Sequence, residues 1–234
     1  MKIKGIQEFT LIDYPGKIAC TLFLYGCNFK CGFCHNPELV LAPVGKDYSE
    51  KEILDFLEKR KGQLEGVCIT GGEPLLTLDI GFLKKIKDLG YSIKLDTNGS
   101  FPELLEELIK DKLIDYVAMD IKSSKDNYQK ITDSDINIKK IEKSIKVIAS
   151  LLDYYEFRTT ILEDVHDEKE LEEMAKWLNQ LCVGKPKRFT LQGFKNQGKF
   201  IDSSFNNKKD VKENYLKELK EILDEYFDDV DIRS

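Results

Sequence analysis

The sequence has no long uninterrupted apolar run, and its first residues do not form a positively charged segment followed by an apolar one. These absences argue against a membrane-spanning helix and a secretory signal peptide. Positive charge is not in excess either, because 36 Lys and Arg residues stand against 42 Asp and Glu residues. A nucleic-acid-binding surface normally needs clustered basic residues. We therefore expect a cytoplasmic protein that binds neither membranes nor nucleic acids.

Cysteine is present, but not in the pattern of a disulfide-rich secreted domain or a zinc finger. Six cysteines in 234 residues, with no leader segment, favour a reducing compartment over a disulfide framework. Cys20, Cys68 and Cys182 stand alone, and no second pair of closely spaced ligands completes a zinc knuckle. We interpret these three as small buried hydrophobic residues.

The other three cysteines lie in one short loop, 26–35. Cys27, Cys31 and Cys34 have the spacing C-x3-C-x2-C and directly follow an apolar run. Soft sulfur ligands favour zinc, copper or an iron-sulfur cluster. A closed 4Fe-4S cluster takes four cysteines, so three indicate a cluster with one iron open to a substrate or cofactor. His35 could instead complete a Cys3His zinc site, but its place next to Cys34 makes that geometry awkward.

With an aromatic residue before its last cysteine, this loop resembles the signature of the radical S-adenosylmethionine (SAM) enzymes. The segments 13–17 (DYPGK), 26–28 (GCN) and 34–37 (CHNP) resemble the subset that activates glycyl radical enzymes. The sequence is most similar to anaerobic ribonucleoside-triphosphate reductase activating proteins, with pyruvate formate-lyase activating enzyme as a relative. The resemblance extends from about Ile6 to about Lys199.

Apolar, β-branched runs alternate along the chain with helical patterns. Six strands, each followed by a helix, predict a parallel sheet with right-handed crossovers. A closed (β/α)8 barrel typically needs about 250 residues. We predict one α/β domain over 1–234, an open partial (β/α)6 TIM-like barrel, which the radical SAM resemblance also implies. The expected strands are 18–24, 67–70, 92–95, 116–121, 155–161 and 188–191.

Several helix ends are marked by particular residues. Ser49 and Glu52 have the spacing of a capping box, which begins a helix. Gly90 suits the end of the next helix, and Pro102 suits the start of the one after it.

The SAM contacts follow from the resemblance. Gly71-Gly72-Glu73-Pro74 comes directly after the second expected strand. By itself it reads as a tight turn, but one strand after the cysteine loop it resembles the motif that holds the amino group of SAM. Gly72 and Glu73 would make this contact. Phe33 and His35 would lie against the adenine.

Two neighbouring expected strands end in carboxylates, Asp96 and Asp120, and hard oxygen ligands of this kind suit a cation. The resemblance to pyruvate formate-lyase activating enzyme implies a monovalent cation held by Asp96, Thr97, Asp120 and the carbonyl of Ala118. The alternative is that Asp96 caps a turn and Asp120 pairs with Lys122.

Lys122 and Arg158 are candidate partners for the carboxylate and ribose of SAM or for the substrate backbone, because a cation on a barrel strand usually has a specific anion. An ion pair of Arg158 with Glu156 or Asp120 is the alternative. A further SAM contact on the sixth expected strand falls on Gln192 or Lys195, depending on the alignment. His166, in an acidic loop, is expected to be solvated.

The resemblance implies an oxidoreductase that holds a 4Fe-4S cluster, takes an electron from reduced flavodoxin or ferredoxin, cleaves SAM and generates a glycyl radical on a partner enzyme. Anaerobic ribonucleoside-triphosphate reductase is the expected partner. The first alternative is a radical SAM enzyme that acts on a small molecule, such as a deazapurine-forming synthase. The second is a metal-binding interaction module without enzymatic activity.

Overall fold

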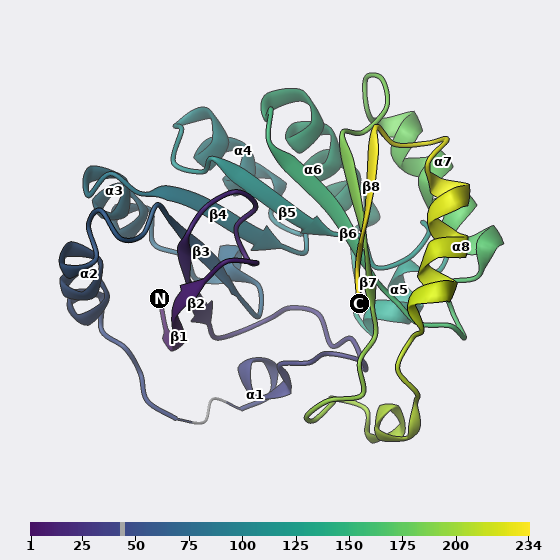
Figure 1. The fold of residues 1–234 in the computed structure, drawn as a ribbon, viewed down its shortest axis with the longest axis horizontal. Helices are drawn as coiled ribbons and strands as arrows, with labels where there is room; N and C mark the ends of the chain where they lie inside the picture. Colours follow the sequence, from purple (N-terminus) through teal and green to yellow (C-terminus); the bar gives the residue numbers. More distant parts are fainter. Residues whose placement is uncertain (43–44) are drawn as a thin grey trace. The chain divides into compact units, whose positions relative to one another are not determined.

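The computed structural model describes residues 1–42 and 45–234 (Figure 1). Within these residues the strands form an eight-stranded sheet in the order β1 to β8. The strands are β1 (Ile3–Thr10), β2 (Ala19–Leu24), β3 (Gly66–Gly71), β4 (Ser92–Thr97), β5 (Tyr116–Asp120), β6 (Tyr155–Ile161), β7 (Arg188–Gly193) and β8 (Asp229–Arg233).

Helices connect most of the successive strands. They are α1 (Pro37–Val40), α2 (Glu50–Lys59), α3 (Ile80–Asp88), α4 (Pro102–Lys110), α5 (Tyr128–Thr132), α6 (Ile138–Leu151), α7 (Glu168–Leu181) and α8 (Glu213–Leu223), with short 3-10 helices η1 (Pro74–Leu76) and η2 (Ser203–Asn207). In the described part of the chain, none of these helices is long and apolar enough to span a membrane.

The chain divides into two compact units, which we describe separately. Unit 1 comprises Met1–Asn28, Asn36–Thr97 and Glu103–Val117, and unit 2 comprises Phe29–His35, Asn98–Pro102 and Ala118–Ser234. The expectation of a single domain over 1–234 stays a prediction.

All six expected strands are present as β2 to β7, with ends that differ by at most two residues. The two edge strands, β1 and β8, were not predicted. The expectation of a purely parallel sheet is wrong, because β1 pairs antiparallel with β2. The pairs β2–β3, β3–β4, β6–β7 and β7–β8 are parallel. The missed β1 carries mostly exposed or half-buried residues, so its sequence lacks the apolar run of a central strand.

The three marked helix ends are confirmed. The Ser49 side chain accepts from the Glu52 amide and the Glu52 carboxylate accepts from the Ser49 amide, which makes a complete capping box at the start of α2. Helix α3 ends two residues before Gly90, whose amide donates to the Lys87 carbonyl at 2.8 Å. Helix α4 begins at Pro102.

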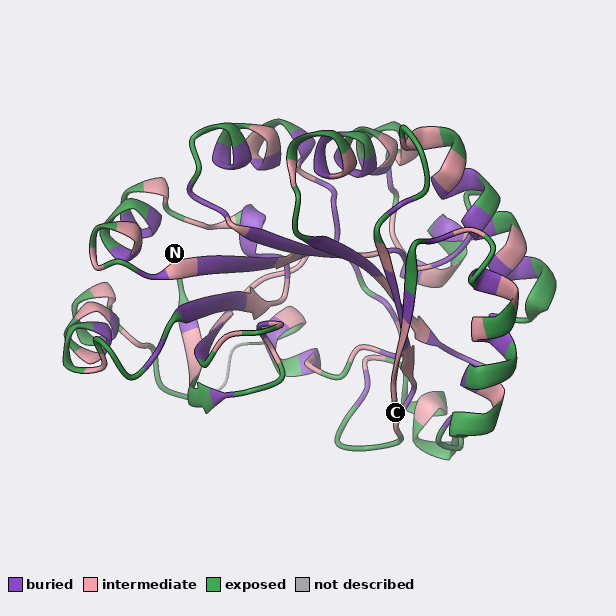
Figure 2. Cartoon of the chain, turned by 45° about the horizontal axis from the view of Figure 1, so that its top comes forward, coloured by how far each residue is buried: buried purple, intermediate pink, exposed green. Residues whose placement is uncertain are grey.

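The core of unit 1 lies between β2 to β4 and the helices that follow them (Figure 2). Helices α2 and α3 pack together in this unit (Figure 1). Cys20 and Cys68 have no exposed surface, so their interpretation as core residues is confirmed. The same interpretation is wrong for Cys182, which is only partly buried. Burial raises the pKa of Cys20 to about 12, which keeps this thiol protonated and inert.

In unit 2, helix α7 packs against both α6 and α8. The expectation that His166 is solvated is wrong, because this residue has no exposed surface. Its Nδ1 accepts from the Leu162 amide at 3.0 Å, and its Nε2 lies 3.0 Å from the Lys122 carbonyl oxygen. Since Nδ1 accepts, the proton belongs on Nε2, which donates to that carbonyl. Neutral His166 therefore joins the loop after β6 to the segment after β5.

His166 gives the protein a pH-dependent stability. Burial is the main reason why its folded-state pKa lies below 6.5, so the unfolded chain takes up a proton first as the pH falls. We expect the free energy of unfolding to fall below pH 6.5, by at most about 1.4 kcal/mol per pH unit. Chemical unfolding at pH 7.5 and 5.5 should show a smaller loss for His166→Gln than for the wild type.

Tyr215→Phe is the matched control for this measurement. It removes the hydroxyl that donates to the His166 carbonyl at 2.9 Å but keeps the imidazole. This variant should lose stability equally at both pH values relative to the wild type. An unchanged pH dependence in His166→Gln would contradict the assignment.

Candidate functional site

In unit 1, the cysteine loop starts on top of the Gly-Gly-Glu-Pro turn. The Gly72 amide donates to the Leu24 carbonyl at 2.9 Å, and the Glu73 amide donates to the Gly26 carbonyl at 2.7 Å. A Cβ atom on Gly72 would lie 2.0 Å from the Gly26 carbonyl oxygen and 3.2 Å from the Cys27 Cβ. Only glycine permits this approach of two backbones, so the turn fixes the start of the loop at Cys27.

The Glu73 carboxylate is buried and held in one orientation. Its side chain caps η1 by accepting from the Leu75 amide at 3.1 Å, and the Thr97 hydroxyl donates to it at 2.8 Å. Glu73 has no exposed surface. A carboxylate is acceptor-only when ionised and accepts well from an ammonium group, so this oriented acid suits the amino group predicted to bind there.

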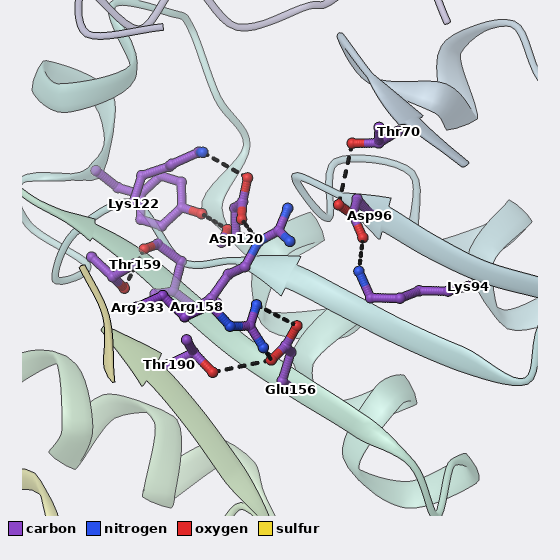
Figure 3. Close-up of polar contacts among 12 residues, drawn as sticks. Thr70, Lys94, Asp96, Asp120, Lys122, Glu156, Arg158, Thr159, Thr190 and Arg233 are labelled. Atoms are coloured by element: carbon purple, nitrogen blue, oxygen red, sulfur yellow. Dashed lines mark hydrogen bonds and ion pairs between the residues drawn. The ribbon is translucent and has the colours of Figure 1, made fainter. Parts of the chain in front are cut away.

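Asp96, at the end of β4, is already paired inside unit 1. One carboxylate oxygen accepts a hydrogen bond from the Lys94 ammonium, and the other accepts from the Thr70 hydroxyl at 3.2 Å (Figure 3). The Lys94 side chain is 2% exposed. The sequence did not lead us to predict a role for Lys94, although its position two residues before Asp96 places both side chains on one face of the strand.

In unit 2, Cys31 and Cys34 belong to one tight turn. The Cys34 amide donates to the Cys31 carbonyl at 3.0 Å, and the Gly32 carbonyl accepts from the Asp202 amide at 3.0 Å. Burial raises the pKa of the Cys31 thiol to about 11, although the charge of Lys122 opposes this shift. A metal must therefore displace a proton from Cys31 at neutral pH.

An aromatic cluster packs against the residues that flank Cys34. Phe33 contacts Phe205 with ring centroids 6.1 Å apart, and His35 contacts Phe194 at 5.6 Å and Phe200 at 5.3 Å. These three phenylalanines follow β7 and were missed, although aromatic residues in so polar a stretch were a usable signal. A cavity of about 230 Å³ borders the cluster, and its lining consists of 162–165, Phe194, Phe205, 207–209 and Val211.

Lys122 and Arg158 share one carboxylate at the end of β5. Asp120 accepts from the Lys122 ammonium at 2.8 Å and from Arg158 Nε at 2.5 Å (Figure 3). Burial alone would raise the pKa of Asp120, but the charges of Arg158 and Lys122 outweigh it and hold this pKa well below its usual range. The Lys122 ammonium also lies 6.0 Å from the centre of the Phe33 ring.

The pairing of Arg158 answers one question left open by the sequence. Arg158 pairs with Asp120, and Glu156 accepts from Arg233 at 2.7 Å and from the Thr190 hydroxyl at 3.0 Å (Figure 3). Of the two candidates for the sixth-strand contact, Gln192 lies within β7 and Lys195 lies beyond its end. The choice between them stays a prediction.

We expect Asp120→Asn to destabilise the protein. The substitution leaves Lys122 and Arg158 close together without their shared charge, and their side chains are only 14% and 13% exposed. Removing one partner of a buried ion pair costs about 3 kcal/mol or more. Urea unfolding should show this loss.

Asp229→Asn is the matched control for this substitution. It removes the carboxylate, 53% exposed, that pairs with Arg188, and an exposed pair is worth less than about 1 kcal/mol. Equal losses for the two variants would contradict a special role of the Asp120 pairing.

Residues 21–178 match the family model described as the radical SAM superfamily. The protein therefore belongs to the radical SAM superfamily, whose members are enzymes that use a 4Fe-4S cluster and SAM, and it is an oxidoreductase.

Among known proteins, a Methanocaldococcus jannaschii protein described as a candidate glycyl-radical enzyme activating enzyme is 36% identical over 99% of this chain and 95% of its own length. The pyruvate formate-lyase-activating enzyme of Clostridium pasteurianum is 35% identical over 56% of this chain and 57% of its own. Particular closeness to activators of the anaerobic reductase stays a prediction.

Solved structures agree on the fold. Streptococcus suis SuiB bound to S-adenosylmethionine superposes with a TM-score of 0.70 at 17% identity over 91% of this chain, which spans 49% of the SuiB chain. Escherichia coli coproporphyrinogen III oxidase, a radical SAM enzyme, gives 0.61 at 12% identity over 92% of this chain and 54% of its own. The predicted fold class, an open partial (β/α)6 barrel of the radical SAM type, is confirmed.

The residues fit the cofactors of the superfamily in their chemistry. Cys27 belongs to unit 1, while Cys31 and Cys34 belong to unit 2. In residues 1–42 and 45–234, no three His, Cys, Asp or Glu side chains are already assembled as a metal site. The fit therefore rests on three soft donors in one short loop, with the oriented acid Glu73 beside Gly72 for an amino group.

The monovalent cation fits less well. Asp96 is neutralised by Lys94, and Asp120 is paired with two cations. Two positive charges about 4 Å apart repel by about 4 kcal/mol at an effective dielectric constant of about 20. Each carboxylate already has a cationic partner, which weakens its attraction for an alkali ion.

Proposed function

We propose that this protein generates a glycyl radical on a partner enzyme, most directly anaerobic ribonucleoside-triphosphate reductase. The observation that carries the proposal is the similarity to the M. jannaschii protein, which extends over nearly the whole length of both chains. The same match extends over 99% of this chain, and the chain contains the Gly-Gly-Glu-Pro turn and the cysteine loop, the predicted sites for the amino group and the cluster.

Each residue predicted to hold the cluster or SAM has a role in this proposal. Cys27, Cys31 and Cys34 hold the 4Fe-4S cluster, and Gly72 and Glu73 bind the amino group of SAM. Lys122 and Arg158 bind its carboxylate and ribose, and Phe33 and His35 lie against the adenine. When bound, the cluster and SAM supply a 5'-deoxyadenosyl radical that can remove a hydrogen atom from the partner's glycine.

The electron donor is reduced flavodoxin or ferredoxin, and the location is the cytoplasm. Thiol ligands for an oxygen-sensitive cluster support a reducing compartment. The cavity beside the aromatic cluster is lined by apolar residues such as Phe194 and Phe205 and by charged ones such as Asp164 and Lys208, and it supports the idea that a segment of the partner binds there.

The test has two stages. Protein reconstituted without air and supplied with dithionite and SAM should form 5'-deoxyadenosine. Addition of the reductase should then produce a glycyl radical doublet in electron paramagnetic resonance spectra. Cleavage of SAM without any radical on the reductase would reject this partner, whereas no cleavage at all would reject the activase.

A small-molecule substrate is the second candidate. The 7-carboxy-7-deazaguanine synthase of Methanothermobacter thermautotrophicus is 32% identical over 65% of this chain and 65% of its own. That name describes the synthesis of a deazapurine, so the candidate substrate is a small nitrogen heterocycle. Strong stimulation of 5'-deoxyadenosine formation by such a compound, without any protein partner, would favour this function.

A further inference from the structure

Lys94 is a cation buried in unit 1, and it has no place in the proposed cluster or SAM sites. The whole residue is 1% exposed. Because Lys94 and Asp96 are two residues apart on β4, their side chains lie on one face, and the ammonium reaches the carboxylate (Figure 3). A cation buried this deeply needs a partner anion, and Asp96 provides it.

Asp96 is held from a second side as well. Its other oxygen accepts from the Thr70 hydroxyl on β3, and its side chain is 15% exposed. The carboxylate therefore has a full compensating charge and a neutral donor from within the protein. An alkali ion at Asp96 would sit beside the Lys94 ammonium and be repelled by it.

We propose that the Lys94 ammonium takes the place of the monovalent cation that the sequence resemblance implies. Asp96 is then oriented by the protein itself, and the protein binds SAM without need for K⁺ or Na⁺. The part of this inference that concerns SAM rests on the proposed function. The part that concerns the charge at Asp96 does not.

The wild-type protein tests the inference first. The cluster-loaded full chain is compared in KCl, NaCl and choline chloride at one ionic strength, so that general screening is equal. The SAM dissociation constants in the three salts should agree within twofold. The thermal midpoints should agree within experimental error. A SAM affinity at least fivefold tighter in KCl than in choline chloride would overturn the proposal.

Lys94→Met tests it from the other side. Methionine keeps the length of the side chain but removes the positive charge that Lys94 places on Asp96, so an alkali ion should now bind. We expect at least tenfold weaker SAM binding in choline chloride, at least fivefold recovery in KCl, and a thermal midpoint that rises with K⁺ or Na⁺.

The double variant Lys94→Met with Asp96→Asn is the matched control. It has neither charge, so its thermal midpoint should be the same in all three salts. A folded Lys94→Met protein with no response to K⁺ or Na⁺ would overturn the proposal. If Lys94→Met folds in none of the salts, the wild-type comparison decides alone.

Failure of the proposed function would look different. A wild type that binds no SAM in any salt would reject that function, while the thermal midpoints would still decide the charge at Asp96. A thermal midpoint of the wild type that rises with K⁺ but not with choline would reject the role of Lys94 and leave the activase proposal standing.

Discussion

Cys31→Ala is expected to remove the cluster and to abolish SAM cleavage. Cys31 is the most buried of the three clustered thiols and has 7% of its surface exposed, so neither water nor a neighbouring side chain can easily replace it as a ligand. Two remaining thiolates are too few for a cluster of this kind. Iron analysis after anaerobic reconstitution should show less than half of the wild-type content, and 5'-deoxyadenosine should fall to background.

Cys182→Ser is the control for cysteine loss in general. Cys182 lies outside the loop, at the end of α7, and is only partly buried. This variant should keep the iron content and the rate of SAM cleavage of the wild type. Retained cleavage in Cys31→Ala would contradict the ligand assignment, and stoichiometric zinc without iron in the wild type would contradict the cluster itself.

Gly72→Ala is expected to reduce SAM cleavage at least 100-fold. The new Cβ would lie 2.0 Å from the Gly26 carbonyl oxygen, so the turn and the start of the cysteine loop must move apart. That movement displaces both Cys27 and Glu73, and misplacement of about 1 Å in an active site can cost about 100-fold in rate. The rate of 5'-deoxyadenosine formation measures the effect, and iron content shows whether the cluster is still bound.

Gly184→Ala separates this steric effect from ordinary glycine replacement. Gly184 has a φ of +83°, yet an added Cβ there would meet no atom within 4 Å. Its replacement strains the backbone by about 1 kcal/mol but should leave SAM cleavage unchanged. Equal rates for the Gly72→Ala protein and the wild type would show that the turn and the loop are not held as the structure has them.

The sequence predicted the central strands well because their residues are apolar on both faces. In β3, for example, Val67, Cys68 and Ile69 all lack exposed surface, and such a run can be recognised without knowledge of its neighbours. The edge strand β8, with the sequence DVDIR, has one buried residue among five. Its pairing with β7 depends on the fold around it, so no local pattern indicated it.

The site residues could be predicted only where a motif marks them. The cysteine loop and the Gly-Gly-Glu-Pro turn are local patterns with a known chemical use. Lys94, His166 and Phe194 gain their importance from partners supplied by the fold: a carboxylate, a backbone carbonyl of another segment and an imidazole ring. The charged loop sequence around His166 suggested solvent exposure. In the structure, however, both ring nitrogen atoms form hydrogen bonds with backbone groups, and the residue is buried.

The aromatic contacts of His35 and Phe33 have a consequence for biosynthesis. Phe194, Phe200 and Phe205 are among the later residues to leave the ribosome, and until they emerge the second half of the cysteine loop lacks the rings that pack against it. If iron and sulfide were delivered to the nascent chain, the cysteine loop would not yet have its packing against these three rings. Maturation should therefore follow the completion of translation.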